Sequence, residues 1–311
     1  MSDTCMAVRR ANFPDRIRFH APGLKRYATS EYSCQDAQEF VSVSVTGAAC
    51  ALSCEHCGTK VLHGMTELPT FDGSLFELCA GLKERGARGV LISGGSDKSN
   101  RVPLLPHIAD LVRVRRELDM VIRVHPGLPD EETCAGLAEV GIDGAMVDLI
   151  GHADTIREVY HLESTTVDDF DACLERLQRH GVPTVPHIIL GLHFGRMLGE
   201  ERALEMVRRY PPKLLVLVVL MPLGGTNMAG VVPPSLPEIG AFFETARTAL
   251  PRTDVMLGCA RPLGAIKEQI DRLAIDAGLN GIAYPADGIV GYAESKGLEP
   301  EFINACCGVS Y

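Results

Sequence analysis

Three cysteines in one short loop are the residues of this sequence with the clearest capacity for chemistry. Cys50, Cys54 and Cys57 are spaced as Cys-x3-Cys-x2-Cys within residues 47–58. Thiolates are soft ligands that suit iron, and cysteines that hold iron–sulfur clusters come in short loops of this kind. Three thiolates would bind three irons of a [4Fe–4S] cluster and leave the fourth iron open to a small molecule. A zinc knuckle or a set of structural thiols is the alternative, but zinc takes four ligands, and the chain has no second Cys-x2-Cys or His-x3-His pair.

The spacing of these cysteines resembles the signature of the radical S-adenosylmethionine (SAM) superfamily. The resemblance implies that the open iron chelates SAM, and that reductive cleavage of SAM gives a 5′-deoxyadenosyl radical, which abstracts a hydrogen atom from an unactivated carbon. The cofactor would supply this chemistry, while the protein supplies position and shielding. The superfamily often places an aromatic residue beside the last cysteine, near the adenine. His56 is the candidate for that role, and a solvated loop histidine is the alternative.

The elements that position these residues are predicted by short apolar runs that alternate with longer amphipathic segments. Strands alternating with helices of this length indicate βαβ units, and eight of them predict an α/β fold, a closed (β/α)8 TIM-type barrel. The expected strands are 40–46, 89–94, 120–125, 145–150, 184–191, 214–221, 255–259 and 281–283. The expected helices are 73–85, 106–117, 131–140, 168–180, 200–209, 237–250 and 263–277.

Length and composition agree with one such barrel. The chain has 311 residues, of which 46% are hydrophobic. The barrel is expected at residues 39–298, with an N-terminal extension at 1–38 and a C-terminal tail at 299–311 covering one end. A net charge of −10 and the absence of Trp argue against a nucleic-acid-binding protein. No apolar run has transmembrane length and no signal-peptide pattern is seen, so a cytoplasmic location is expected.

Candidates for SAM binding lie at the ends of expected strands, where barrels of this type place their active sites. After the second strand, Ser93, Gly94 and Gly95 let the backbone approach a ligand closely, and they resemble the superfamily's Gly-Gly-Glu segment, which receives the SAM amino group. A serine replaces the glutamate here. At the fourth strand, Asp148 would be a buried carboxylate that needs partners, and ribose hydroxyls are suitable ones. The run that ends in Gly191 is similar to the superfamily segment that packs on adenine.

Two other strand ends carry polar side chains. His125 follows the third expected strand and would either line the substrate cavity or cap the strand. Cys259 and Arg261 follow the seventh, which would place a thiol and a guanidinium at the mouth of the barrel. Residues 221–228 after the sixth strand look like the Pro-x-x-Gly-Thr-Pro-Leu segment of biotin-synthase-like enzymes, except that Asn227 replaces the second proline.

The remaining cysteines suggest a second cluster. Eleven cysteines are many for a chain in a reducing compartment. Three lie within expected helices and are predicted to be small buried hydrophobes: Cys79, Cys134 and Cys173. The adjacent pair Cys306 and Cys307 has little packing value at a chain terminus, so ligation of an auxiliary cluster is the more economical interpretation. Cys34 is the natural third ligand, and Cys259 or Cys5 the fourth.

Runs at 21–27, 258–262 and 305–311 are similar to the two-protein lipoyl synthases, which are biotin-synthase-like radical SAM proteins that work as a pair. The resemblance implies sulfur insertion into an octanoyl chain on a lysine of a carrier protein, either a lipoyl domain or a glycine-cleavage H-type protein. It also implies a second radical SAM partner, an electron donor such as ferredoxin or flavodoxin, and a sacrificial auxiliary [4Fe–4S] cluster as the sulfur source. The Cys-x4-Cys-x5-Cys run of the single-protein lipoyl synthase is absent, so the terminal cysteines would have to replace it.

Two other functions remain open at this point. A radical SAM mutase or small-molecule enzyme, similar to methylornithine synthase or biotin synthase, would have the barrel without a sacrificial cluster. A cluster-assembly scaffold or carrier would use the cysteines without catalysis. A carrier needs no enclosed cavity, so the eight expected strands and the series of SAM contacts argue against this last function.

Overall fold

The computed structural model describes residues 2–21, 27–32 and 39–309. Its strands are β1 (Arg16–His20), β2 (Phe40–Ser44), β3 (Thr66–Glu67), β4 (Gly89–Ser93), β5 (Val121–Val124), β6 (Gly144–Asp148), β7 (Thr184–Leu190), β8 (Leu214–Val219), β9 (Asp254–Leu257), β10 (Gly281–Ala283) and β11 (Glu299–Ile303). Its helices are α1 (Ser2–Asn12), α2 (Leu75–Glu84), α3 (Ile108–Arg113), α4 (Glu131–Val140), α5 (Ala153–Tyr160), α6 (Val167–Arg179), α7 (Glu200–Arg209), α8 (Leu236–Ala249), α9 (Ala265–Asp276) and α10 (Ile289–Ser295).

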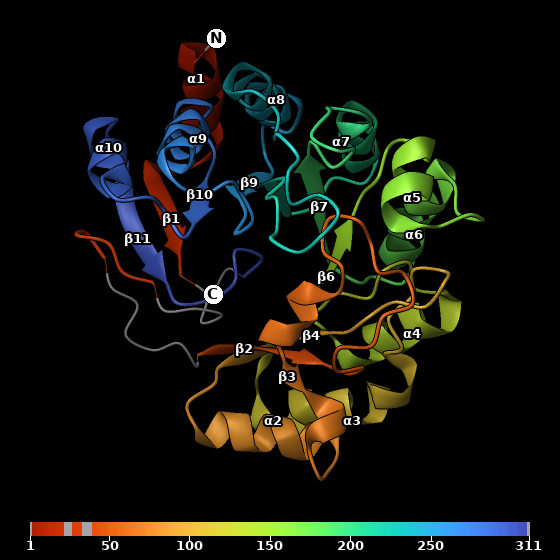
Figure 1. The fold of residues 1–311 in the computed structure, drawn as a ribbon. Coiled ribbons are helices and arrows are strands. Elements are labelled where there is room, and N and C mark those ends of the chain that lie inside the picture. The colour runs from red at the N-terminus through yellow and green to blue at the C-terminus, as the bar shows by residue number, and fades with distance from the viewer. Residues whose placement is uncertain (1, 22–26, 33–38, 310–311) are drawn as a thin grey trace.

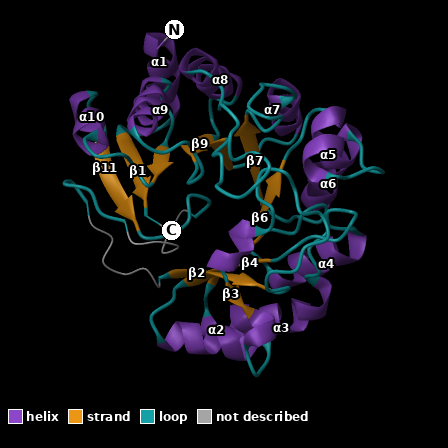
Figure 2. Ribbon diagram, viewed as in Figure 1, coloured by secondary structure: helices purple, strands orange, loops and turns teal. Residues whose placement is uncertain are grey.

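The strands form one curled parallel sheet with helices on its outer face (Figures 1 and 2). The order of its 11 strands is β11-β1-β10-β9-β8-β7-β6-β5-β4-β2-β3, and every pairing is parallel. The α/β, TIM-barrel-like fold expected from the sequence is confirmed. Within the described residues the two edge strands, β11 and β3, do not pair with each other, so the barrel is open on that side.

Each of the eight expected strands is present, with its ends within two residues of the expected positions. Strand β8 is buried along its whole length, as a parallel strand covered on both faces should be. Proline has no N–H to donate to a sheet, so Pro186 within β7 could mark a bend or a bulge. It pairs with Val147, and the register of β6 and β7 runs unbroken from Ala145 opposite Thr184 to Asp148 opposite His187.

The N-terminal and C-terminal extensions also contribute strands, which the sequence analysis does not predict. Strand β1 lies between β10 and β11, and both of its neighbours are parallel to it. Ile17 and Phe19 are fully buried, and Arg18 forms an ion pair with Asp254 at 2.9 Å. The pattern was missed because β1 has five residues and alternates apolar side chains with charged ones. Helix α1 packs outside it, against α8 and α9.

Residues 305–309 turn into the space that the sheet encloses, toward the centre of the view in Figure 1. They pack on side chains from the inner face of the sheet. This interior cluster includes Leu91, Met146, Val185, Val216 and Met256 from the strands and Ala305, Cys307 and Val309 from the tail. The C-terminal segment is therefore part of the inner core of the barrel.

The predicted helices are present with small shifts in their ends, and three of them begin with capping boxes, at Ser74, Thr166 and Ser235. Cys79, Cys134 and Cys173 are fully buried in helices, as predicted. Helix α5 was not predicted, because its eight residues form too short a pattern to detect. None of the described helices combines the length and the apolar character needed to cross a membrane.

Candidate active site

The loop after β2 folds back on itself and brings two of its cysteines into contact. The backbone N–H groups of Cys57 and Gly58 both donate to the carbonyl of Cys54, at 3.2 and 2.8 Å. The thiol of Cys54 hydrogen bonds with that of Cys57, which lowers the pKa of Cys57 to about 7 and raises the pKa of Cys54. Cys50 is near enough that its charge also raises the pKa of Cys54. The loop thus gathers the three thiols named from the sequence.

The turn after β4 packs directly against this loop. A Cβ atom on Gly95 would lie 1.9 Å from the carbonyl oxygen of Ala49 and 2.5 Å from Cα of Cys50. The N–H of Gly95 donates to Oγ1 of Thr46 at 2.7 Å. Gly95 was expected to give a ligand access to the backbone, but here it is needed because two segments of the protein touch. The thiol of Cys50 lies 3.8 Å from the carbonyl of Ser96 in the same turn.

His56, Tyr160 and Asp148 form one wall beside the cysteine loop. The His56 and Tyr160 rings are 5.2 Å apart, and Tyr160 donates to Oδ2 of Asp148 at 3.5 Å. Burial raises the pKa of Tyr160 well above its usual value, so the phenol remains a hydrogen-bond donor. Burial lowers the pKa of His56, whose Nδ1 is buried without a hydrogen-bond partner among the described residues. An unpartnered buried nitrogen fits a site that receives a polar ligand.

Tyr160 was not among the sequence candidates. It is the last residue of α5, a helix that the sequence pattern did not reveal. His187 was also missed. Alternate residues of a strand share a face, so His187 lies on the same face of β7 as Val185, which belongs to the interior cluster. This alternation could have identified His187 from the sequence.

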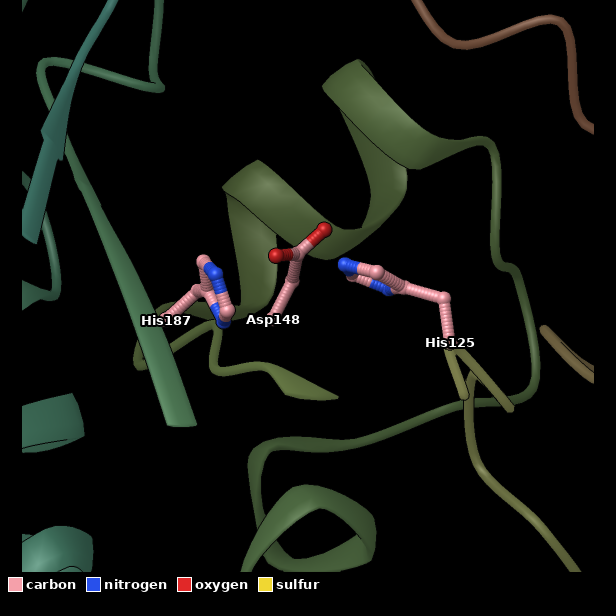
Figure 3. A group of neighbouring side chains, drawn as sticks. All are labelled: His125, Asp148 and His187. Carbon is pink, nitrogen blue, oxygen red and sulfur yellow. The ribbon is translucent and has the colours of Figure 1, made fainter. Parts of the chain in front are cut away.

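Asp148 also belongs to a polar group on the inner face of the sheet. His125 follows β5, Asp148 ends β6 and His187 lies in the middle of β7, and the three side chains point toward one another, with the carboxylate between the two rings (Figure 3). His125 therefore lines the interior, which was one of its two expected positions.

Two more candidates for SAM binding lie at strand ends. Ser93 is buried at the end of β4, and a Cβ atom on the next residue, Gly94, would lie 3.1 Å from Oγ1 of Thr46. Gly191 follows β7 with a positive φ of 76°, and its N–H donates to the buried carboxylate of Glu200 at 2.8 Å. These positions are compatible with the predicted SAM contacts, which remain predictions.

A second group of thiols lies inside the sheet. The thiol of Cys307 hydrogen bonds with those of Cys259 and Cys306, which raises the pKa of Cys307 well above its usual value. Cys307 is buried, whereas Cys259 is exposed. The structure thus brings together three of the four predicted auxiliary ligands, from the end of β9 and from the tail. The fourth, Cys34, lies outside the described residues. Cys5 is buried in α1 against the carbonyl of Glu244 in α8, apart from this group.

A buried guanidinium nitrogen near the second thiol group fits an anionic cluster. The positive charge of Arg123 helps to lower the pKa of Cys306, although the hydrogen bond with Cys307 has the larger effect. His20 donates through Nδ1 to the carbonyl of Ala305 at 3.3 Å. Nε of Arg123 and Nε2 of His20 are both buried without a partner in the described structure. The Nε–H of Arg123 can donate to the sulfur of a bound cluster, so this residue fits such a group. The ring of His20 holds its proton on Nδ1, so its Nε2 is an acceptor.

Arg261 does not lie at the mouth of the barrel, and that expectation was wrong. Its side chain is fully buried and forms a two-pronged ion pair with Asp271 of α9, at 2.6 and 3.1 Å. It also donates to the carbonyls of Gly258 and Tyr284, at 2.9 and 2.8 Å. Its guanidinium therefore links the turn after β9 to α9 and to the segment after β10. The sequence could not show this, because the carboxylate partner lies ten residues away on a different element.

Comparisons with known proteins agree with this geometry. The family model described as the Radical SAM superfamily matches residues 44–207. The chain is 25% identical to a biotin synthase of Chlorobaculum parvum over 202 residues, which cover 60% of this chain and 56% of that protein. It is 24% identical to a biotin synthase of Schizosaccharomyces pombe over 256 residues, covering 79% and 68%. A biotin synthase of Bordetella avium is 26% identical over 252 residues, covering 78% and 75%.

Solved structures show the same fold. The crystal structure of methylornithine synthase superposes with a TM-score of 0.60 at 16% identity, covering 96% of this chain and 88% of that one. The FeFe-hydrogenase maturase HydG from Carboxydothermus hydrogenoformans gives a TM-score of 0.64 at 15% identity, covering 98% and 72%. Identities this low establish the architecture and leave the substrate open.

Proposed function

The chain belongs to the radical SAM superfamily, and on that premise we propose that it inserts sulfur into an octanoyl-lysyl group of a carrier protein, as one partner of a two-protein lipoyl synthase. Enzymes of this superfamily use a [4Fe–4S] cluster and SAM, which together supply a 5′-deoxyadenosyl radical for hydrogen abstraction. Cys50, Cys54 and Cys57 would hold that cluster.

The observation that carries the proposal is the second thiol group. A radical enzyme that only rearranges its substrate needs one cluster, whereas sulfur insertion needs a sulfur source. Cys259, Cys306 and Cys307 meet inside the sheet, next to the unpartnered Nε of Arg123. Three thiols in contact beside a buried donor suit an auxiliary [4Fe–4S] cluster. Cys34 is proposed as its fourth ligand.

The arrangement of the two thiol groups also supports the proposal. Asp148 is near enough to the loop for its charge to raise the pKa of Cys57. Met146, two residues earlier on the same face of β6, packs in the interior cluster that contains Cys307. One strand face therefore runs from the cysteine loop toward the second thiol group. A substrate carbon held along that face would have a hydrogen-abstracting group on one side and a sulfur source on the other, which is the proximity that capture of a carbon radical requires.

Apart from Asp148, the SAM-binding candidates keep their proposed roles around the loop. His56 would lie against the adenine, and Ser93, Gly94 and Gly95 would present backbone groups to SAM. Gly191 would allow the end of β7 to pack close to the adenine. The proposed partners are an octanoylated lipoyl domain or glycine-cleavage H-type protein, a second radical SAM protein, and ferredoxin or flavodoxin as electron donor.

The test measures iron, sulfide and product in one preparation. The protein is reconstituted anaerobically, freed of loose iron, and incubated with SAM, dithionite and an octanoyl-lysyl peptide, with and without a candidate partner protein. The proposal predicts about eight irons per chain, as expected for two [4Fe–4S] clusters, and a thiolated octanoyl product by mass spectrometry. About four irons with 5′-deoxyadenosine and no thiolated product would favour instead a mutase or small-molecule enzyme of the methylornithine-synthase or biotin-synthase type.

A further inference from the structure

We propose that His125, Asp148 and His187 bind a divalent first-row transition-metal ion, separate from both cysteine groups. Two imidazoles and one carboxylate are a donor set that suits zinc and ferrous iron, and with three protein ligands such an ion keeps open coordination positions. One atom from each of these side chains lies within 4.8 Å of the other two. Ligands about 2.1 Å from one ion in tetrahedral geometry are about 3.4 Å apart. The three atoms therefore need to close by no more than roughly 1.4 Å, which is within reach of side-chain rotations.

The sheet holds the three side chains in place. Asp148 and His187 are direct partners in the β6–β7 pairing, and His125 follows β5, the strand on the other side of β6. The N–H of His125 donates to the carbonyl of Ile92 on β4 at 2.9 Å, so the hydrogen bonds between β4 and β5 continue as far as His125. Figure 3 shows the two imidazole rings on either side of the carboxylate. A site built on three neighbouring strands is more rigid than a site built on a loop.

The protonation state of His187 is suitable for a metal ligand. Its Nδ1 lies 3.0 Å from the carbonyl of Val185. A carbonyl can only accept, so Nδ1 carries the proton and Nε2 offers its lone pair to the group. Metal-binding histidines commonly have such a second hydrogen bond, which fixes the tautomer and the ring orientation.

The group lies between the two cysteine sites. Tyr160 donates to Asp148 from the side of the cysteine loop. On the other side, the residues two positions earlier on the same strands are Arg123, Met146 and Val185, and Met146 and Val185 pack with Cys307 in the interior cluster. Two residues of a strand span roughly 6.6 Å. An ion held there would have its open positions facing the interior, where water or an oxygen or sulfur donor of a substrate could complete its coordination.

The experiment titrates Co²⁺ into the full chain after anaerobic reconstitution of its iron–sulfur clusters and removal of loose iron. Cobalt bound by imidazole and carboxylate gives d–d absorption without the thiolate-to-cobalt charge-transfer bands that cysteine ligands produce. We expect about one cobalt per chain and a rise in Tm on binding. His125→Gln, Asp148→Asn and His187→Gln should each weaken binding by about 100-fold and abolish the Tm rise. His193→Gln is the matched control, because His193 is also buried but lies outside the group.

Three outcomes would overturn the metal site. Cobalt uptake could be unchanged in all three variants, or its absorption could carry thiolate charge-transfer bands. Asp148→Asn could also reduce SAM affinity while leaving cobalt binding intact, which would assign the carboxylate to SAM. Circular dichroism of each variant without cobalt identifies loss of folding, and any misfolded variant is replaced by His125→Asn or His187→Asn. Because the titration involves no turnover, its failure would leave the proposed sulfur insertion standing, and failure of sulfur insertion would leave the metal site standing.

Discussion

The two cysteine groups are built in opposite ways. Cys50, Cys54 and Cys57 lie within eight residues, and hydrogen bonds inside their own loop and to the turn at Ser96 hold them together. Cys259 and the pair Cys306–Cys307 are 47 residues apart, counted from 259 to 306, and meet only because the tail enters the curled sheet. The first group therefore needs its own loop and the neighbouring turn after β4, whereas the second needs the complete barrel.

The two sites also differ in the conformational entropy that the chain loses when each site forms. Closing a short loop loses little chain entropy, so a local cluster site can form early and tolerate distant changes. A site made from distant segments depends on every contact that holds those segments together, here including the packing of Ala305 and Val309. Substitutions should therefore affect the two sites unequally.

The largest expected effect is at the cysteine loop. Changing Cys50, Cys54 and Cys57 together to Ala removes all three thiolates, so we expect SAM cleavage to be abolished while the second site keeps about four irons. Dithionite-dependent formation of 5′-deoxyadenosine, measured by chromatography, checks this. Continued production by the triple variant would refute the assignment of the loop.

The next effect is at the second group. Cys306→Ala with Cys307→Ala should lower the iron content by about half and remove the thiolated product, while 5′-deoxyadenosine continues to form. Substitution is a cleaner test than truncation, because deleting the tail would also expose the interior core that Ala305 and Val309 cover. Cys173→Ala is the control for the loss of a buried thiol alone. Full sulfur insertion by the double variant would show that the pair is not needed.

A third prediction concerns the contact between the two segments at the radical site. Gly95→Ala should destabilise the protein by about 1–3 kcal/mol, the usual range for overpacking, because the new methyl group meets the backbone of Ala49 and Cys50. Urea unfolding measures this, and iron analysis should show a weakened first cluster with the second unaffected. Gly64→Ala is the control, since a Cβ atom there has no neighbour within 4 Å. Equal unfolding free energies for the two variants would contradict the proposed close contact.

The smallest effect is an acid sensitivity of the tail region. Burial lowers the pKa of His20 from 6.5 to about 3. Between these values the unfolded chain binds more protons than the folded one, so stability is complete above pH 6.5 and decreases as the pH falls toward 3. This one group contributes a slope of up to about 1.4 kcal/mol per pH unit. Urea unfolding of His20→Gln between pH 5 and pH 7 should show a shallower decline than the unchanged protein, and parallel curves would remove His20 as the cause.

Sequence reasoning was most successful where a pattern is repeated or contiguous. The eight alternating apolar runs identified the eight strands they were assigned to, and the cysteine spacing located the loop whose thiols the structure brings together. Several of the missed elements are short. Strand β1 has five residues with charged side chains between its apolar ones, and α5 has eight residues. Their positions are set by tertiary packing, which a local pattern does not record.

Site residues were missed for the same reason. His187 and Tyr160 come from separate elements, and only the folded chain shows that both lie beside Asp148. The position of Arg261 was predicted wrongly, because a charged side chain at a strand end can point toward solvent or into the protein. The ion pair with the buried carboxylate of Asp271 on α9 holds it inside the protein. The grouping of Cys259 with the terminal pair was anticipated from residue chemistry, although their contact depends on the course of the tail.

The entry of the tail into the sheet also has a consequence for the assembly of the enzyme. Residues 305–309 follow all 11 strands in the sequence, so during synthesis the cysteine loop is complete long before the second thiol group can exist. Iron delivered to the nascent chain would meet the first site alone. A cluster consumed as a sulfur donor would then have to be rebuilt inside an already folded barrel. The exposed thiol of Cys259 provides a point of contact there for an incoming iron or sulfide carrier.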